Sequence, residues 1–294
     1  MKNLSLIYFV LFATILSCSQ PKKQNNQEKE TTEGFVTDTP AKADIKADNI
    51  QSAVYGYYVG MFKASIFDRD KKPSYANKIT VSIDSLKDKI VYGHSIVAGN
   101  WRPFQGEWST LDNVLLVNAK EPGDDRYDGV FEFSIYPESQ IISGIWKAND
   151  KNLAVTQREY SLEKREFTYN PKLELPDYIA WQDLYDQNNE IVDGAEFLTE
   201  DVLKVNASIQ PLKKEDVENL YKGDLEVIRN SIYARHGYSF KNRKMRYVFD
   251  SAVDWYMPVS IDVRGQITDL ERQNIELIKR YEEHATAYYD AFGR

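Results

Sequence analysis

The sequence predicts an α+β protein with two folded domains, an antiparallel β-meander followed by a small all-α domain. Apolar and polar residues alternate in short runs between positions 54 and 169, which is typical of half-buried strands. Beyond position 213 the apolar residues recur with a period of about 3.6, which is typical of amphipathic helices. A length of 294 residues agrees with two domains of about 150 residues each.

The composition excludes several classes of protein. Apolar residues make up 42% of the chain and charged residues 28%, so the chain can bury a core and is neither globally disordered nor collagen-like. The 37 basic and 45 acidic residues give a net charge of −8. We therefore predict that nucleic acid is not a partner, because neutralising phosphates requires an excess of cations.

Residues 1–17 are predicted to be a lipoprotein signal peptide. Lys2 precedes an apolar run over 4–16, which is shorter than the roughly 20 residues of a membrane-spanning helix. Ser17 stands directly before Cys18, the single cysteine of the chain. This arrangement resembles a bacterial lipobox, in which cleavage leaves the cysteine at the N-terminus carrying lipid such as palmitate. The alternative is a lone cysteine inside an ordinary signal sequence.

The signal also predicts a location. We expect the protein in the bacterial cell envelope, attached to a membrane through the lipid on Cys18 and facing the periplasm or the cell surface. Ser19 is not the aspartate that resembles an inner-membrane retention signal, so the outer membrane is favoured. Residues 18–52 are polar and charged with few apolar side chains, which predicts a disordered tether.

The β domain is expected over residues 53–169. Its clearest strands lie at 78–84 and 130–136, each with large apolar side chains at alternate positions. Short connections make neighbouring strands antiparallel, so about eight strands favour a small up-and-down barrel, with a two-sheet sandwich as the alternative. The remaining runs lie at 55–62, 90–97, 101–108, 114–119, 141–146 and 158–162.

One predicted hairpin in this domain carries candidate ligand contacts. Trp101, Arg102 and Phe104 combine aromatic rings with a cation, which suits stacking on a sugar or holding an anion. The alternative is that these aromatic residues belong to the core. His94 is in phase with Ile90 and is predicted to face the interior as a hydrogen-bonded core residue.

The helical domain is expected over residues 213–294, after a connector at 170–212. Its first helices are a short one at 215–221 and a longer one capped by Asp224 and ended by Gly237.

Two further helices follow. Asn242 is predicted to cap the first of them, whose apolar residues are spaced at helical intervals. Thr268 and Glu271 have the spacing of a capping box, which predicts the start of the last helix.

The segment over 228–240 reads IRNSIYARHGYSF, and its five central letters YARHG name a known domain. Blocks at 249–258 and 270–278 are also similar to that family, in the same order. The region from Leu198 to His284 therefore resembles the YARHG domain. The resemblance implies an extracytoplasmic bacterial domain, often found on lipoproteins, for which cell-envelope interaction is the usual suggestion. It supplies no catalytic residues.

Charged residues inside the apolar face of the YARHG helix predict a structural network. Arg229 and His236 lie within that face, and a buried arginine must be paired. Carboxylates later in the domain would then fix how the helices cross. The candidate network consists of Arg229, Tyr233, Asp250, Asp254 and Glu271.

A second hypothesis for this region is an anion-binding site. Between positions 235 and 246 the chain has five basic residues and no acidic one, within a domain of 14 basic and 14 acidic residues. A solvated surface is the alternative for such a charge cluster. The candidate anion-binding residues are Arg235, His236, Lys241, Arg243, Lys244 and Arg246.

These features favour a lipid-anchored envelope-binding or scaffold protein. Its partner would be an anionic envelope polymer, peptidoglycan or lipopolysaccharide, or an envelope protein. The alternatives are a hydrolase of an envelope polymer and a lipocalin-like carrier of a small molecule.

The sequence argues against an enzyme and predicts no cofactor or metal. It lacks the G-x-S-x-G and H-E-x-x-H motifs and contains three histidines. The loop at 121–129 has Arg126 where a calcium loop needs a ligand. A pair of carboxylates for glycoside chemistry stays open.

Overall fold

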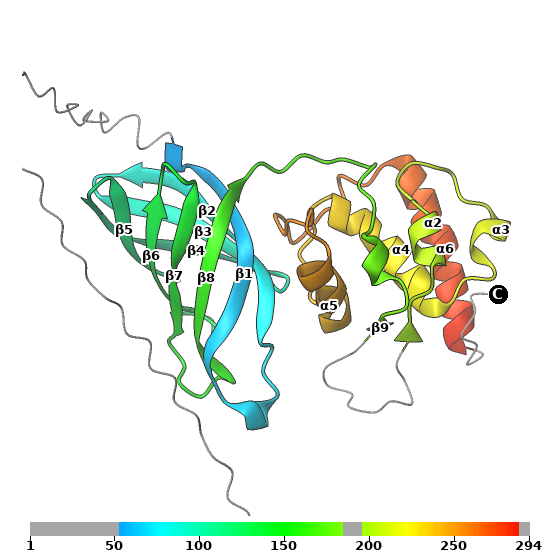
Figure 1. Cartoon of the computed structure of the whole chain (residues 1–294), viewed down its shortest axis with the longest axis horizontal. Helices are drawn as coiled ribbons and strands as arrows, with labels where there is room; N and C mark the ends of the chain where they lie inside the picture. Colours follow the sequence, from blue (N-terminus) through cyan, green and yellow to red (C-terminus); the bar gives the residue numbers. More distant parts are fainter. Residues whose placement is uncertain (1–52, 185–195, 288–294) are drawn as a thin grey trace, which may run out of the picture. The chain divides into compact units, whose positions relative to one another are not determined.

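The structure is a computed structural model that describes residues 53–184 and 196–287 (Figure 1). The predictions for the signal peptide, Cys18 and the tether lie outside the described residues. No helix within these two ranges combines the length and the apolar character needed to cross a bilayer.

The N-terminal half of the described chain is a closed barrel of eight strands in sequential order, each antiparallel to its neighbours (Figure 1). The first strand, β1, pairs with the last, β8, and this pairing closes the sheet. The sequence allowed a barrel or a sandwich, and the structure is a barrel. The strands are β1 (Gly56–Phe67), β2 (Ala76–Lys87), β3 (Ile90–Val97), β4 (Asn100–Leu111), β5 (Val114–Lys120), β6 (Gly129–Tyr136), β7 (Ile141–Ala148) and β8 (Val155–Arg165).

One end of the barrel is plugged by the chain that enters it. Val54 precedes β1 and is fully buried in the core of the barrel. The Tyr58 hydroxyl donates to the Val54 carbonyl at 2.9 Å, and Lys164 Nζ donates to the Ala53 carbonyl at 2.6 Å. The opposite end, where β1 finishes and β8 starts, is therefore the end at which a cavity has room to form.

The C-terminal part is built on three helices with two short ones before them. α4 and α6 pack together, and α5 contacts β2 of the barrel. The main helices are α4 (Lys222–Arg235), α5 (Arg243–Ala252) and α6 (Asp269–Ala287). The short elements are η1 (Arg69–Lys71), η2 (Asp177–Ile179), β9 (Asp183–Leu184), β10 (Glu196–Phe197), α2 (Asp201–Lys204) and α3 (Lys214–Val217).

Two of the predicted helix starts are confirmed and one is wrong. Asn242 caps α5, because its side chain accepts from the Lys244 amide at 2.8 Å. The Thr268 amide donates to Glu271 Oε2 at 3.0 Å, and the Glu271 amide donates to Thr268 Oγ1 at 3.2 Å, which forms the capping box of α6. Asp224 is not a cap.

Asp224 lies inside the first turn of α4, which begins at Lys222 after Tyr221. Its buried carboxylate instead accepts from the Thr199 amide at 2.8 Å and from the Thr199 hydroxyl at 2.7 Å. The sequence near the helix could not indicate a partner 25 residues upstream.

The core of the helices extends upstream of position 213. Leu175, Ile179 and Leu198, within the segment expected as a connector, are buried in the same cluster as Ile228 and Phe249. This segment therefore forms part of the helical region's core.

The barrel and the helices meet directly. The Lys78 amide on β2 donates to Asp250 Oδ2 at 3.0 Å, and Lys78 Nζ donates to the Val253 carbonyl at 2.7 Å. At the β3–β4 turn the Gly99 amide donates to Ser239 Oγ at 2.9 Å. Gly99 has a φ of +73° and lies against Lys241, so a side chain there would be strained and would clash. These contacts place α5 beside the open end of the barrel.

Candidate anion-binding cavity at the open end of the barrel

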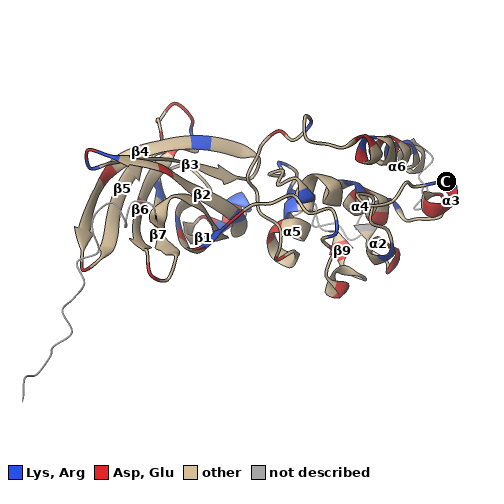
Figure 2. Ribbon diagram, turned by 90° about the horizontal axis from the view of Figure 1, so that it is seen from above, with Lys and Arg blue, Asp and Glu red and all other residues tan. Residues whose placement is uncertain are grey.

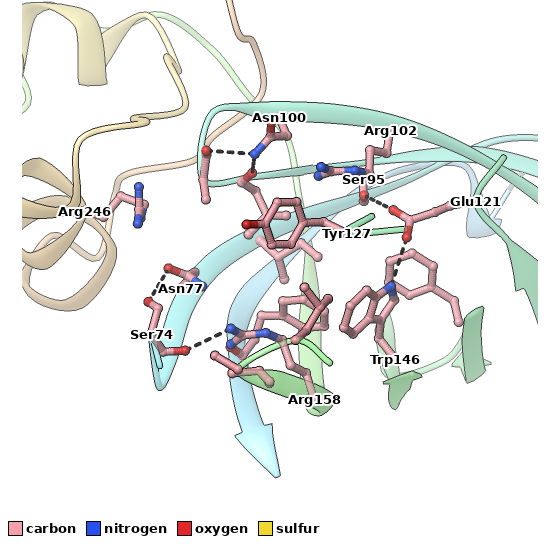
Figure 3. A pocket seen from close by; sticks show the side chains of 18 of the residues that line it. Ser74, Asn77, Ser95, Asn100, Arg102, Glu121, Tyr127, Trp146, Arg158 and Arg246 are labelled. Atoms are coloured by element: carbon pink, nitrogen blue, oxygen red, sulfur yellow. Dashed lines mark hydrogen bonds between the residues drawn. The ribbon is translucent and has the colours of Figure 1, made fainter. Parts of the chain in front are cut away.

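A cavity of about 370 Å³ occupies the end of the barrel opposite Val54 (Figure 3). Its inner wall is apolar and aromatic, and its charged side chains come from the barrel and from α5. The size is within the usual range for small-molecule sites. The apolar wall includes Phe62, Ile79, Phe131 and Trp146, and the charged residues are Arg102, Glu121, Arg158, Arg243 and Arg246.

Arg158 is a buried cation on the inner surface of β8. Its Nη1 donates to the Phe62 carbonyl and its Nη2 to the Ser74 carbonyl, both at 2.9 Å. The guanidinium carbon lies 5.1 Å from the centre of the Phe62 ring. Burial, with a smaller effect of the nearby Arg246, lowers the pKa of Arg158 to about 10. Arg158 remains charged at neutral pH, and within the part of the chain that the structure describes its guanidinium bonds to carbonyls and not to a carboxylate.

Arg246 approaches the cavity from the opposite side, on α5 (Figure 3). Its Nη1 donates to the carbonyls of Phe240, at 3.4 Å, and Lys241. Burial lowers the pKa of Arg246, while the charge of Asp250 opposes this effect. Figure 2 shows basic residues of α5 beside the barrel strands. A second guanidinium bonded to backbone carbonyls thus lines the same space as Arg158.

Arg102 differs from these two arginines because it is neutralised within the barrel. Its Nε donates to Asp128 Oδ1 at 3.1 Å, and its Nη2 donates to Asp125 Oδ1 at 3.3 Å. Asp128 in turn accepts from the amides of Gly123 and Asp125 and so orders the loop after β5. Arg102 is therefore part of the wall of the cavity rather than an unbalanced charge.

Glu121 is the single carboxylate in the lining of this cavity. Its Oε2 accepts from the Gly129 amide at 2.7 Å and from Trp146 Nε1 at 3.0 Å, and Ser95 donates to its Oε1 at 3.3 Å (Figure 3). Burial raises the pKa of Glu121 to about 7, although the bonds from Trp146 and Gly129 oppose the shift. Glu121 consequently loses much of its negative charge just below neutral pH.

The charge balance of the cavity suits an anion. Arg246 lies close enough to Arg158 to lower the pKa of Arg158, and both arginines bond to carbonyls. An anion between two such guanidinium groups would form charge-assisted hydrogen bonds. A lining with one carboxylate offers no acid and nucleophile pair for glycoside chemistry. Within the described ranges no cluster of three or more His, Cys, Asp and Glu residues is arranged to hold a metal ion.

The structure divides the predicted basic cluster. Arg243 and Arg246 line the cavity. Lys244 pairs with Glu226 of α4, and Lys241 is exposed beside the β3–β4 turn. Arg235 and His236 lie in the interior of the helical region.

Arg235 is 3% exposed and has a structural set of contacts. Its Nε donates to the Leu173 carbonyl at 2.9 Å, and its Nη1 donates to Ser231 Oγ at 3.0 Å. The guanidinium carbon lies 6.0 Å from the centre of the Trp255 ring. Arg235 thus connects α4 to the preceding and following segments of the chain and does not reach the cavity.

His236 is also 3% exposed and is paired with a buried glutamate. Its Nε2 lies 2.8 Å from Glu271 Oε2, and its ring stacks on Tyr169 with centres 4.1 Å apart. The Tyr169 hydroxyl donates to Glu271 Oε1 at 3.0 Å. Burial alone would raise the pKa of Glu271, but hydrogen bonds from His236 and the Thr268 amide outweigh burial and hold it at about 2.

The structural network does not form as predicted, because Arg229 pairs with a different acid. Arg229 forms a two-pronged pair with Glu282 of α6, at 2.7 Å and 3.0 Å, and not with any of the proposed acids. Asp250 accepts from Lys78 of the barrel, and the Asp254 side chain is exposed.

The remaining members of that network lie near α4. Glu271 binds His236 rather than an arginine, and Tyr233 packs partly buried against the helical core. Two acids assigned to this network therefore serve other contacts, one of them at the barrel.

The three candidate contacts of the β domain do not form one site. Arg102 and Phe104 point inward, and Phe104 is a core residue with its ring 5.4 Å from that of Phe131. Trp101 points outward and is 48% exposed, with its ring 5.3 Å from that of His94.

The prediction that His94 faces the interior is wrong. Its Nδ1 lies 2.8 Å from Asp84 Oδ2 on the outer face of the barrel, while Val91 and Ser95 occupy the interior positions of β3. Ile96 is buried on the outer side of this strand, so the large apolar residues indicated the wrong face.

Sequence reasoning missed Arg158 as a site residue and placed Glu121 only in a loop. Arg158 on β8 is in phase with the inward Tyr160 and Leu162, and Glu121, directly after the end of β5, continues the inward phase of Ala119. A charged residue that continues the apolar face of a predicted barrel strand is the signal that would have found them.

The comparison with known families identifies the helical region. Residues 200–283 match the YARHG domain, which confirms the resemblance expected from Leu198 to His284. The chain thus joins an eight-stranded barrel to a helical YARHG domain. No curated protein and no solved structure matches the chain.

Proposed function

We propose that this protein is a lipid-anchored binding protein of the bacterial cell envelope that holds an anionic group at the junction of its barrel and α5. The single observation that carries the proposal is the pair Arg158 and Arg246, which line one cavity and bond to backbone carbonyls. The two cations come from different parts of the chain, so the site requires both.

Two further features support an envelope location. The sequence around Cys18 resembles a lipobox, and the match over 200–283 is to a domain that we associate with the envelope. The protein as a whole carries a charge of −8, so a cationic cavity is a local feature and not a consequence of a basic chain. Such a cavity would attract an anionic group. The net negative charge of the rest of the protein would repel polyanions that have no group able to enter the cavity.

The test is co-sedimentation of the purified full-length protein with purified sacculi at near-physiological salt. We expect retention of the native protein and its loss when Arg243→Glu is combined with Arg246→Glu. The matched control combines Arg264→Glu with Arg280→Glu, which makes the same charge change at exposed positions of the helical region. Equal retention of the two double variants would contradict the proposed site.

A further inference from the structure

The cavity has two chemically different zones. The rim and one wall carry guanidinium groups, whereas the inner wall consists of Phe62, Phe131 and Trp146, whose rings belong to the barrel core. The Phe62 and Trp146 ring centres lie 5.8 Å apart, edge to face, so this wall is a packed aromatic surface. A ligand that touches both zones must be charged at one end and apolar at the other.

Glu121 and Trp146, two polar side chains that line the inner zone, are already hydrogen-bonded. Glu121 accepts from Trp146 Nε1, the Gly129 amide and the Ser95 hydroxyl, so the buried indole and amide donors are satisfied before any ligand arrives. The inner zone therefore does not call for a second charge, and burying one there would be costly. An uncharged body fits this zone.

Arg158 and Arg246 define the position of the charged end. Arg158 is buried and reaches the cavity from β8, and Arg246 reaches it from α5, with Asn77 and Ser74 between them at the rim (Figure 3). Each guanidinium has five N–H donors, and the hydrogen bonds to carbonyls come from two nitrogen atoms of Arg158 and one of Arg246. The remaining donors suit a carboxylate, sulfonate or phosphate group.

We infer that the cavity binds a small amphiphilic anion, with its acidic group between Arg158 and Arg246 and its apolar or aromatic body against Trp146 and Phe131. This inference rests on the proposed function and names the ligand class of the same site. With a cavity of about 370 Å³, the body is the size of two or three rings rather than a long acyl chain or a polymer segment.

The probe is anilinonaphthalene sulfonate, which has an acidic group on an aromatic body and fluoresces when its body leaves water. Phenylnaphthylamine is the same body without the sulfonate, and inorganic phosphate is an anion without the body. We expect the purified full-length protein to bind one sulfonate probe, to bind the neutral analogue at least about tenfold more weakly, and to release little probe to an equal concentration of phosphate.

Variants locate the binding. Arg158→Gln and Arg246→Gln should each raise the dissociation constant of the sulfonate probe about tenfold or more, Arg158→Lys should restore part of the affinity, and the exposed control Arg264→Gln should leave it unchanged. Because Arg158 is buried, its variants are first compared with the native protein by circular dichroism. The rim variant Arg246→Gln tests the inference even where Arg158→Gln does not fold.

Three results would overturn the inferred ligand class. These are equal affinity for the neutral analogue, full competition by phosphate, and sulfonate binding that neither arginine variant weakens. Arginine-dependent binding to sacculi without probe binding would leave the proposed function standing and reject the amphiphilic ligand. Arginine-dependent probe binding without retention on sacculi would support the amphiphilic ligand and reject the proposed envelope binding.

Discussion

The barrel and the helical region each bury a glutamate, but the pKa of the two carboxyl groups is shifted in opposite directions. Glu121 is 6% exposed and Glu271 is fully buried, and each accepts several hydrogen bonds. Burial raises the pKa of Glu121 to about 7, whereas the donors around Glu271 overcome burial and hold its pKa at about 2. Burial alone therefore does not decide the charge of a carboxyl group; the donors supplied by the fold do.

The difference between the donors has a structural origin. Glu271 lies in the first turn of α6 and receives the Thr268 amide, the hydroxyls of Thr268 and Tyr169, and His236. Glu121 lies between strands and receives one amide, one indole and one hydroxyl group. The first carboxylate is part of the architecture of the helices, and the second is part of the wall of a cavity.

The largest expected effect comes from Glu271→Gln. The carboxylate accepts hydrogen bonds from Thr268 and Tyr169 and pairs with His236, and an amide cannot replace it in all three contacts. We therefore expect a loss of about 3 kcal/mol in the free energy of unfolding. The measurement is urea denaturation followed by far-UV circular dichroism. Glu276→Gln, at an exposed position of the same helix, is the control and should stay within about 0.5 kcal/mol of the native protein.

The native carboxylate also predicts the acid limb of stability. Because the folded pKa of Glu271 is about 2 and its ordinary value is 4.5, its contribution is complete above pH 4.5 and is lost as the pH falls toward 2. Glu271→Gln should remove this part of the pH dependence. An unchanged acid limb in the variant would show that the charge of Glu271 is not what α6 requires.

A smaller effect is expected from Thr268→Ala. The substitution removes the hydroxyl that accepts from the Glu271 amide and donates to the Glu271 carboxylate, but it keeps the amide that donates to the same carboxylate, so we expect a loss of about 1 kcal/mol. The control is Thr286→Ala on the same helix, where the hydroxyl donates to the Glu282 carbonyl at an exposed position. Equal losses in the same denaturation experiment would mean that the capping box adds nothing to α6.

The smallest effect at neutral pH is expected from Glu121→Gln, and its sign depends on pH. The folded pKa of about 7 exceeds the ordinary 4.5, so the stability that Glu121 contributes is complete below pH 4.5 and is lost as the pH rises through 7. The amide should remove this decline while changing the free energy of unfolding at neutral pH by less than about 1 kcal/mol. Melting temperatures across this pH range provide the measurement. A variant that declines as steeply as the native protein would contradict the shifted pKa.

The sequence predicted the elements of both regions better than their contacts. Alternation located all eight strands, and cap residues located the starts of α5 and α6, because these signals are local. The pairing of Arg229 with Glu282 and of Asp224 with Thr199 joins distant positions, and nothing near either residue specifies its partner.

The same limit applied to the candidate site. The basic cluster contained Arg243 and Arg246, but the complementary cation Arg158 comes from a strand far upstream, so the cavity could not be assembled from one segment. The role of Arg235 also depends on burial. Its charge suggested an anion site, but the residue is 3% exposed inside the helical core.

The pairing of β1 with β8 has a consequence for the order of folding. Tyr57 of β1 pairs with Arg165 of β8, so both edges of β1 are hydrogen-bonded only after β8 has formed. Until residues 155–165 have been synthesised, β1 keeps one edge open, and such an edge is a template for pairing with another chain. Closure of the barrel thus depends on contacts distant in sequence, which form slowly. The cavity, whose Arg158 lies on that last strand, comes into being only with this final step.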